Sequence, residues 1–280
     1  MKKLALVVPL LLAVPGCPKP RTSAATQPTP AAFDPSQSDP EAIKVVEAGV
    51  AALGGAEHWT NLKELQFTIK YTQDGKVQGE LTHYWDRWNG RHRLITTDMS
   101  TVGGNPDDVK QMDVRYDLFD KGATPTASYG GDPLLRADAV KQVAAAREHL
   151  AQDLYFVAMI YKLEEPGVIL KRENAEVTVP DPKACKPSCT AIKVTFDPAV
   201  GKDTWFVNYN NESHLPEVIE LQKGAGRVGY LLEDWTEAGG LKWPGSLHNI
   251  GLPGEVIQIE DLKVGEPDDA TYMPSVSGGG

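Results

Sequence analysis

Residues 65–97, which read LQFTIKYTQDGKVQGELTHYWDRWNGRHRLITT, decide the fold class. Apolar and polar side chains alternate along 65–71, and this period of two is typical of a strand with one buried face. The dipeptides Asp74-Gly75 and Asn89-Gly90 are typical of tight turns between antiparallel strands. The stretch therefore predicts a meander of three antiparallel strands, over residues 65–71, 77–85 and 91–97.

The segments on either side of this meander add helices and more strands. Asp39-Pro40-Glu41 combines an N-cap carboxylate, a first-turn proline and an acidic residue, so a helix should begin there and end at Gly54-Gly55. Residues 137–163 predict a helix or a helical pair, whose part 154–161 is entirely apolar and should be buried on every side. Further strands are predicted at residues 113–119, 168–172, 176–179, 190–196, 204–209, 217–222, 228–235, 246–250 and 256–264.

These elements amount to about a dozen strands against few helices, and open sheets of that width usually curl. We therefore predict a mainly β fold with helices (α+β), in which a strongly curved antiparallel sheet wraps around the buried helix. Because no second linker interrupts the pattern, residues 40–274 should form a single domain. The glycine-rich residues 275–280 should form a flexible tail.

The N-terminal segment predicts export and anchoring to a membrane. A basic start and the apolar residues 4–14 have the pattern of a signal peptide, and Cys17 follows a small residue as in a bacterial lipobox. We predict a signal peptide over 1–16 and a diacylglycerol on the Cys17 thiol. Residues 17–39 are rich in proline and small polar residues, which predicts an extended tether. The alternative is a plain secretory signal with an incidental cysteine.

Pro18, rather than aspartate, follows the predicted lipidated cysteine. By resemblance to enterobacterial lipoproteins, this implies release to the outer membrane. The expected location is therefore the bacterial cell envelope, with the folded domain anchored to the outer membrane and facing the periplasm.

Charge and motifs exclude several classes of function. The chain has 280 residues and a net charge of −10, so it lacks the basic surface that nucleic-acid binding requires. Residues 224–229 match G-x-G-x-x-G, but a strand pattern follows where a dinucleotide site needs a helix. The sequence shows no G-x-S-x-G elbow and no tight histidine ligand spacing. We expect no enzymatic activity, no metal and no cofactor.

Cys185 and Cys189 form a C-x3-C pair on a turn between two predicted strands. In an exported chain this spacing predicts a disulfide that staples a hairpin. Because the spacing is not C-x-x-C, a thioredoxin-type redox role is disfavoured. Redox or metal chemistry at this pair is the alternative.

Several loose motifs follow one another along residues 45–274. They are ALGGAEHW at 52–59, DLYFVAMIYKL at 153–163, DTWFV at 203–207, HLP at 214–216, LEDW at 232–235, GGLKWP at 239–244 and PDDATYMP at 267–274. Their order resembles the outer-membrane lipoprotein-sorting superfamily, the LolA/LolB-like half-barrels and their lipid-binding relatives. The resemblance implies a half β-barrel of about eleven strands with a helical lid, and an apolar space between sheet and lid that holds acyl chains.

Aromatic and aliphatic residues on the predicted strands and lid are candidates to line such a cavity, because rings supply large, stiff apolar surface around a ligand. The alternative is that the same residues are ordinary core. The candidates are Phe67, Ile69, Tyr71, Trp85, Leu94, Phe156, Ile160, Trp205 and Trp235.

Three functions from different classes are compatible with these observations. The leading hypothesis is a non-enzymatic lipoprotein that binds or carries a lipid or a lipoprotein acyl chain in the apolar cavity. The second is an envelope interaction or assembly subunit whose half-barrel is filled by its own side chains, with an unidentified protein partner. The third is an envelope hydrolase, which would need a cluster such as His–Asp–Ser in a cleft.

Overall fold

The alternating residues of the meander form the centre of the sheet in the computed structural model. β1 (Glu64–Gln73) pairs with β2 (Lys76–Asp86), which pairs with β3 (Arg91–Thr97), and both pairs are antiparallel. Asp74 and Gly75 have φ values of 50° and 75°, the left-handed conformation that a two-residue hairpin turn requires. The structure describes residues 33–103, 105, 108–120, 122–173 and 184–273.

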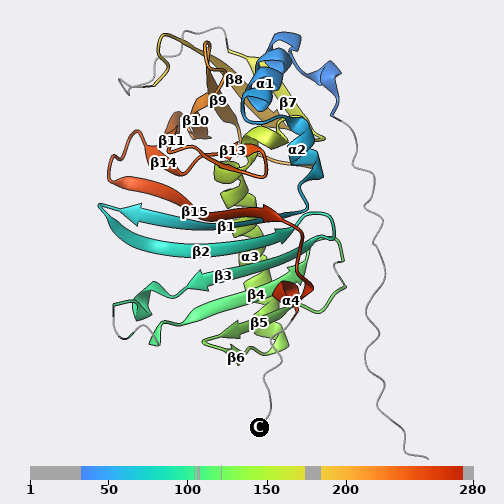
Figure 1. Cartoon of the computed structure of the whole chain (residues 1–280), viewed down its shortest axis with the longest axis vertical. Coiled ribbons are helices and arrows are strands. Elements are labelled where there is room, and N and C mark those ends of the chain that lie inside the picture. Colours follow the sequence, from blue (N-terminus) through green and yellow to red (C-terminus); the bar gives the residue numbers. More distant parts are fainter. Residues whose placement is uncertain (1–32, 104, 106–107, 121, 174–183, 274–280) are drawn as a thin grey trace, which may run out of the picture.

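The remaining strands extend this centre in both directions. They are β4 (Gln111–Asp117), β5 (Thr126–Tyr129), β6 (Asp132–Pro133), β7 (Val168–Arg172), β8 (Cys189–Phe196), β9 (Trp205–Asn210), β10 (Pro216–Lys223), β11 (Gly226–Glu233), β12 (Thr236–Ala238), β13 (Leu241–Trp243), β14 (Ser246–Asn249) and β15 (Glu255–Gly265). One 13-stranded sheet has the order β6-β5-β4-β3-β2-β1-β15-β14-β11-β10-β9-β8-β7, and β12 and β13 form a separate hairpin (Figure 1). The sheet is therefore not closed into a barrel.

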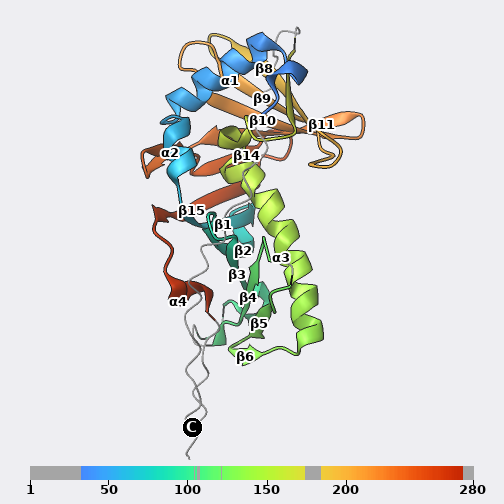
Figure 2. The ribbon, with the colours of Figure 1, turned by 90° about the vertical axis from the view of Figure 1, so that its right-hand side faces the viewer.

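The longest helix, α3, lies along one face of the sheet, and shorter helical elements lie at the N-terminal end, between β3 and β4, and at the C-terminal end of the described chain. They are η1 (Pro35–Gln37), α1 (Pro40–Ala52), α2 (Ala56–Asn61), η2 (Met99–Thr101), α3 (Arg136–Val157), η4 (Met159–Lys162) and α4 (Asp269–Tyr272). Figure 2 shows α3 running along one face of the sheet, from beside β6 to the half that contains β8–β11. The helix therefore forms the lid that the sequence predicts. Among the described residues, no helix is both long enough and apolar enough to cross a bilayer.

The core lies between the helices and the concave sheet. Leu65, Phe67 and Ile69 of β1 are fully buried, as their alternation predicts. The carboxylate of Asp39 caps α1 by accepting a hydrogen bond from the Glu41 backbone N–H at 2.9 Å, so this helix begins at the predicted residue. Leu65, Phe67 and Ile69 belong to one continuous apolar cluster that also contains the buried apolar residues of α3.

The predicted fold class is confirmed: a mainly β fold with a helical lid, in which a curved antiparallel sheet packs against a buried helical segment. The sheet has 13 strands rather than about eleven, because β5 and β6 extend one edge. The all-apolar residues 154–161 span the end of α3 and the start of η4, and every one except Tyr155 is buried. Of residues 224–229, Gly224 and Ala225 form a hairpin turn and the rest belong to β11, so a strand and not a helix follows the turn.

Several predictions fall wholly or partly outside the described residues. They concern the signal peptide at 1–16, the lipidated Cys17, most of the tether at 17–39, the strand at 176–179 and the tail at 275–280.

Candidate functional site

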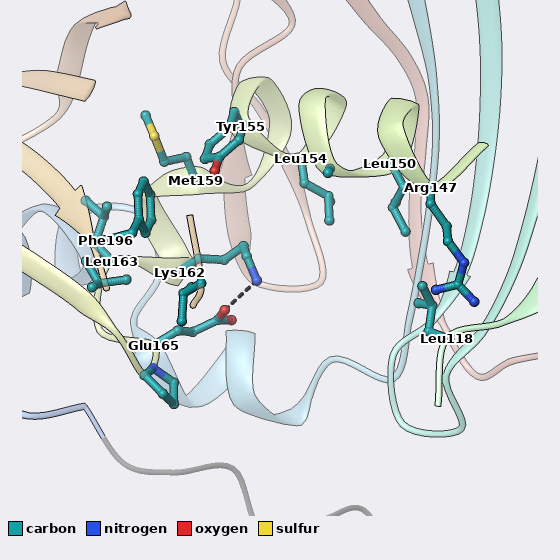
Figure 3. Close-up of a pocket in the computed structure, with 14 residues that line it drawn as sticks. Leu118, Arg147, Leu150, Leu154, Tyr155, Met159, Lys162, Leu163, Glu165 and Phe196 are labelled. Atoms are coloured by element: carbon teal, nitrogen blue, oxygen red, sulfur yellow. Dashed lines mark hydrogen bonds and ion pairs between the residues drawn. The ribbon is translucent and has the colours of Figure 1, made fainter. Parts of the chain in front are cut away.

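The first cavity lies beside the C-terminal half of α3 and has a volume of about 410 Å³. Its wall combines one side of α3 and η4 with β7, the end of β8 and the loop that follows each of β4 and β8 (Figure 3). Most of the lining is apolar, and the apolar residues are Leu118, Leu150, Ala151, Leu154, Tyr155, Met159, Leu163, Pro166, Val168, Phe196 and Val200. A pocket of this size and lining is suited to a flexible apolar ligand.

The charged residues of the first cavity stand at its two ends, as Figure 3 shows. At one end, the Arg147 guanidinium donates a hydrogen bond to the Asp117 backbone oxygen at 2.6 Å and lies 4.8 Å from the centre of the Tyr116 ring. At the other end, the Lys162 ammonium forms an ion pair with the Glu165 carboxylate. Because these charged residues stand at the two ends, the described residues that line the middle of the cavity are uncharged.

A second cavity, of about 840 Å³, is bounded by α3 and by β9, β10 and β11. Its apolar lining consists of Ala151, Tyr155, Phe156, Trp205, Leu221, Val228 and Tyr230. Its polar lining consists of Glu148, Gln152, Lys202, Asp203 and Lys223. The charged residues carry both signs, so this cavity has a mixed rim around an aromatic interior.

The predicted cavity residues are divided between these two spaces and the filled core. Phe156 and Trp205 line the second cavity. Ile160 and Trp235 border a void of about 10 Å³, at the lower limit of what holds one water molecule. The other five, Phe67, Ile69, Tyr71, Trp85 and Leu94, line neither of the two cavities. Of the predicted residues, those that line one of these two cavities therefore lie beside the C-terminal end of α3, and those on β1–β3 do not.

Five predicted residues on β1–β3 pack against other side chains. The Phe67 ring stacks on the His83 imidazole with centres 4.6 Å apart, and the Trp85 ring lies 6.5 Å from that of Trp59. Ile69 and Leu94 are buried in the core. Tyr71 instead makes a polar contact with Asp153 of α3.

A buried polar cluster joins α3 to β1–β3, and the sequence reasoning missed it. The Asp153 carboxylate of α3 accepts hydrogen bonds from the Tyr71 hydroxyl and, at 2.9 Å, from His83 Nε2. His83 Nδ1 lies 3.2 Å from His92 Nε2 on the neighbouring strand. Asp153, His83 and His92 are each fully buried. The available signal was their position, because both histidines occupy inward-facing places in strands otherwise apolar on that face.

Burial determines the protonation of this cluster. It lowers the pKa of His83, although the Asp153 carboxylate opposes this, and it lowers the pKa of His92 well below its usual value. Burial and the Asp153 charge raise the pKa of the Tyr71 hydroxyl, which therefore stays protonated. A neutral His83 that donates through Nε2 must accept through Nδ1, so His92 donates to it through Nε2. His92 Nδ1 has no partner within the described residues.

The cluster contains the Asp–His pair of a catalytic triad but neither the triad's nucleophile nor its access to substrate. Neither cavity is lined by Tyr71, His83, His92 or Asp153. A general base must come within hydrogen-bond reach of its substrate, which a fully buried group cannot do without a large opening of the fold. The arrangement is suited to holding α3 on the sheet.

Cys185 and Cys189 are joined by a disulfide in the structure, at the start of β8. The Asn210 side-chain amide donates to the Lys186 backbone oxygen at 2.8 Å and so ties this short loop to β9. Both cavities lie elsewhere, and neither is lined by the two cysteines.

The chain matches no protein-family model and no curated protein. Solved structures that it resembles include a DUF1329 family protein from Desulfovibrio piger, with 10% identity, a TM-score of 0.45 and coverage of 85% of this chain and 99% of that chain. Another is a domain from Vibrio parahaemolyticus named as an outer membrane lipoprotein-sorting protein, with 8% identity, a TM-score of 0.41 and coverage of 83% and 96%. The MucA/MucB complex of Pseudomonas aeruginosa gives 12% identity, a TM-score of 0.20 and coverage of 82% and 61%.

Proposed function

We propose that this protein binds an acyl chain of a lipid or of a lipoprotein, without catalysis, in the apolar cavity beside α3. The observation that carries the proposal is the cavity itself, with about 410 Å³ of open volume and an almost wholly apolar wall. Among the described residues that line it, the charged ones stand at the two ends: Arg147 bonds to a backbone oxygen, and Lys162 pairs with Glu165. A ligand in its middle section must therefore be apolar.

The energetics favour a chain of moderate length. Burial of each CH₂ group contributes about 0.8 kcal/mol, so a chain of about twelve carbons gains roughly 10 kcal/mol before the costs of association. No polar recognition is needed for binding of this strength. The Arg147 guanidinium at one end can keep its backbone contact and still offer its other N–H groups to an acidic head group.

The location follows from the N-terminal segment. We propose that Cys17 carries the acyl anchor, that residues 17–39 form the tether, and that the domain faces the periplasm from the outer membrane. The acidic net charge of −10 and the C-x3-C disulfide are compatible with an exported protein. The domain would then hold its ligand within a tether's length of the membrane.

A second candidate is an interaction or assembly subunit that carries no lipid. It is favoured by one observation: the space between β1–β3 and α3 is filled by the protein's own side chains, Phe67, Ile69 and Leu94 among them. Under this alternative the two cavities beside α3 would bind no lipid.

Native mass spectrometry after incubation with lipid separates these candidates. The full chain, with Cys17→Ser so that no acyl group of its own competes, would be incubated with lauroyl lysophosphatidylcholine and analysed without detergent. We expect one lipid per chain. Phe196→Asp, which charges the cavity wall, should abolish binding, whereas Phe119→Asp at a half-exposed ring outside both cavities should not.

Both variants must unfold at the temperature of the parent chain for this comparison to count. A clean lipid-free mass for the parent would overturn the proposal and favour the interaction subunit, whose partner would then be sought by cross-linking in envelope preparations.

A further inference from the structure

One aromatic residue separates the two cavities beside α3. Tyr155, in the last turn of the helix, lines both of them, as does Ala151 one turn before it. The Tyr155 ring stacks on Trp205, with centres 4.9 Å apart, and meets the edge of Phe196 at 6.2 Å. Trp205 lines only the larger cavity and Phe196 only the smaller one. The three rings are therefore a partition between two neighbouring spaces.

Apolar contacts hold this partition in place, because Tyr155 and Phe196 pack against the apolar core that contains Trp205. Within the described residues, the Tyr155 hydroxyl has no hydrogen-bond partner, and the side chain is partly exposed. Burial and the nearby Asp203 carboxylate raise the pKa of this hydroxyl, so it stays neutral. Ala151, the other shared residue, is exposed, which places the common rim of the two cavities at the surface of α3.

We propose that the two cavities together bind one diacyl lipid, with one acyl chain on each side of Tyr155 and the glycerol backbone over Ala151. This inference rests on the proposed function and names its ligand class. The volumes of about 410 and 840 Å³ both fall in the usual range for ligand pockets, about 300–1,000 Å³. Two apolar spaces that meet at an exposed rim match a ligand with two tails joined at one end.

The rim of the larger cavity also fits a head group at that position. Lys202 and Lys223 carry positive charge there, and Asp203 and Glu148 carry negative charge. A rim with both signs can pair with both charges of a zwitterionic phospholipid head group. The chains would then point inward from the rim, one to Phe196 and one to Trp205.

Two lipids with the same head group and different numbers of tails test this arrangement. Dilauroyl phosphatidylcholine and lauroyl lysophosphatidylcholine would be offered to the full chain bearing Cys17→Ser, and the occupancy of each read by native mass spectrometry. We expect both lipids to bind at one per chain. Leu118→Trp narrows only the smaller cavity, and Val228→Trp only the larger one.

Each narrowing variant should reduce occupancy by the two-tailed lipid at least tenfold. Val228→Trp should leave the one-tailed lipid bound in the smaller cavity, whereas Leu118→Trp should reduce its binding as well. Val77→Trp, at an exposed valine that lines neither cavity, is the matched control and should change neither lipid. Leu221→Trp, also on the larger cavity, replaces Val228→Trp if that variant does not fold with the parent's circular dichroism spectrum.

The outcomes distinguish this inference from the proposed function. If neither lipid binds the parent chain, the proposed function itself fails. If the one-tailed lipid binds and the two-tailed lipid does not, or if narrowing the larger cavity leaves the two-tailed lipid bound, the two-chain arrangement is wrong and the single-chain site stands.

Discussion

Replacing Asp153 with asparagine should destabilise the fold by about 1.5–3 kcal/mol, because it removes one hydrogen bond to a buried charge. The carboxylate accepts from both the Tyr71 hydroxyl and His83 Nε2, and its side chain is fully buried. Asparagine has the same shape but only one acceptor oxygen, so one of the two donors loses its acceptor. The Tyr71 hydroxyl can turn and accept from the new amide, which limits the loss.

Asp153→Ala should cost more, about 3–5 kcal/mol, because it leaves both donors unsatisfied in the interior. The matched control is Asp138→Asn on the same helix. Asp138 is half exposed and pairs with Lys141 at 3.1 Å, so its loss should change stability by less than about 0.5 kcal/mol.

Urea unfolding at pH 7.5, followed by circular dichroism, measures the three differences directly. The expected order of stability is parent and Asp138→Asn together, then Asp153→Asn, then Asp153→Ala. If Asp153→Asn unfolds within 0.5 kcal/mol of the parent, the cluster does not hold α3 on the sheet, and the reasoning that assigns it a structural role is refuted.

Two further predictions concern other buried positions. Because burial lowers the pKa of His83 and of His92, the unfolded chain binds more protons than the folded chain below about pH 6.5. Stability should therefore be fully present above that pH. It should fall on acidification by up to about 1.4 kcal/mol per pH unit for each imidazole, until the pH reaches the pKa of that imidazole in the folded chain. His92→Gln should reduce the slope of the unfolding free energy against pH, measured by urea unfolding between pH 6.5 and 5.5, by the contribution of one imidazole. An unchanged slope would contradict this. Gly49→Ala should destabilise α1 by about 1–3 kcal/mol despite alanine's helix propensity, since its Cβ would lie 2.3 Å from Cε1 of the buried Tyr209; a raised melting temperature would show that the ring can move away.

Strand alternation, turn dipeptides and helix caps were enough to predict most of the sheet. Each is a local property: Asp39 caps α1 whatever lies beyond it, and Asp74-Gly75 turns the chain between β1 and β2. The edge strands β5 and β6 escaped prediction because they are short and their residues are mainly polar or small. α2, at Ala56–Asn61, is too short to show a helical period.

The location of the cavity could not be predicted in the same way. Alternation shows that Phe67 and Ile69 face inward, but not whether a helix or an empty space faces them. That depends on where α3 crosses the sheet, and Asp153 contributes to this by binding partners from β1 and β2. Phe156 and Trp205 line the second cavity, but the apolar sequence around them does not differ from that around the residues that fill the core.

Two faces of the C-terminal part of α3 therefore differ in how easily their contacts break, because Asp153 contacts β1 and β2 whereas Tyr155 contacts Trp205 and Phe196. This difference decides how a lipid would reach the cavities. Lifting the helix from β1–β3 would expose the Asp153 cluster and break hydrogen bonds to a buried charge, at a cost of several kcal/mol. Turning the Tyr155 ring away from Trp205 and Phe196 breaks two aromatic contacts, each about 0.5–1.5 kcal/mol, and some apolar packing, but leaves the hydrogen bonds of Asp153 in place. The cheaper motion opens the partition and leaves the lid in place. Lipid exchange should accordingly become faster in Tyr155→Ala and stay unchanged in Asp153→Asn, whereas a lid that swings as a whole would give the opposite result.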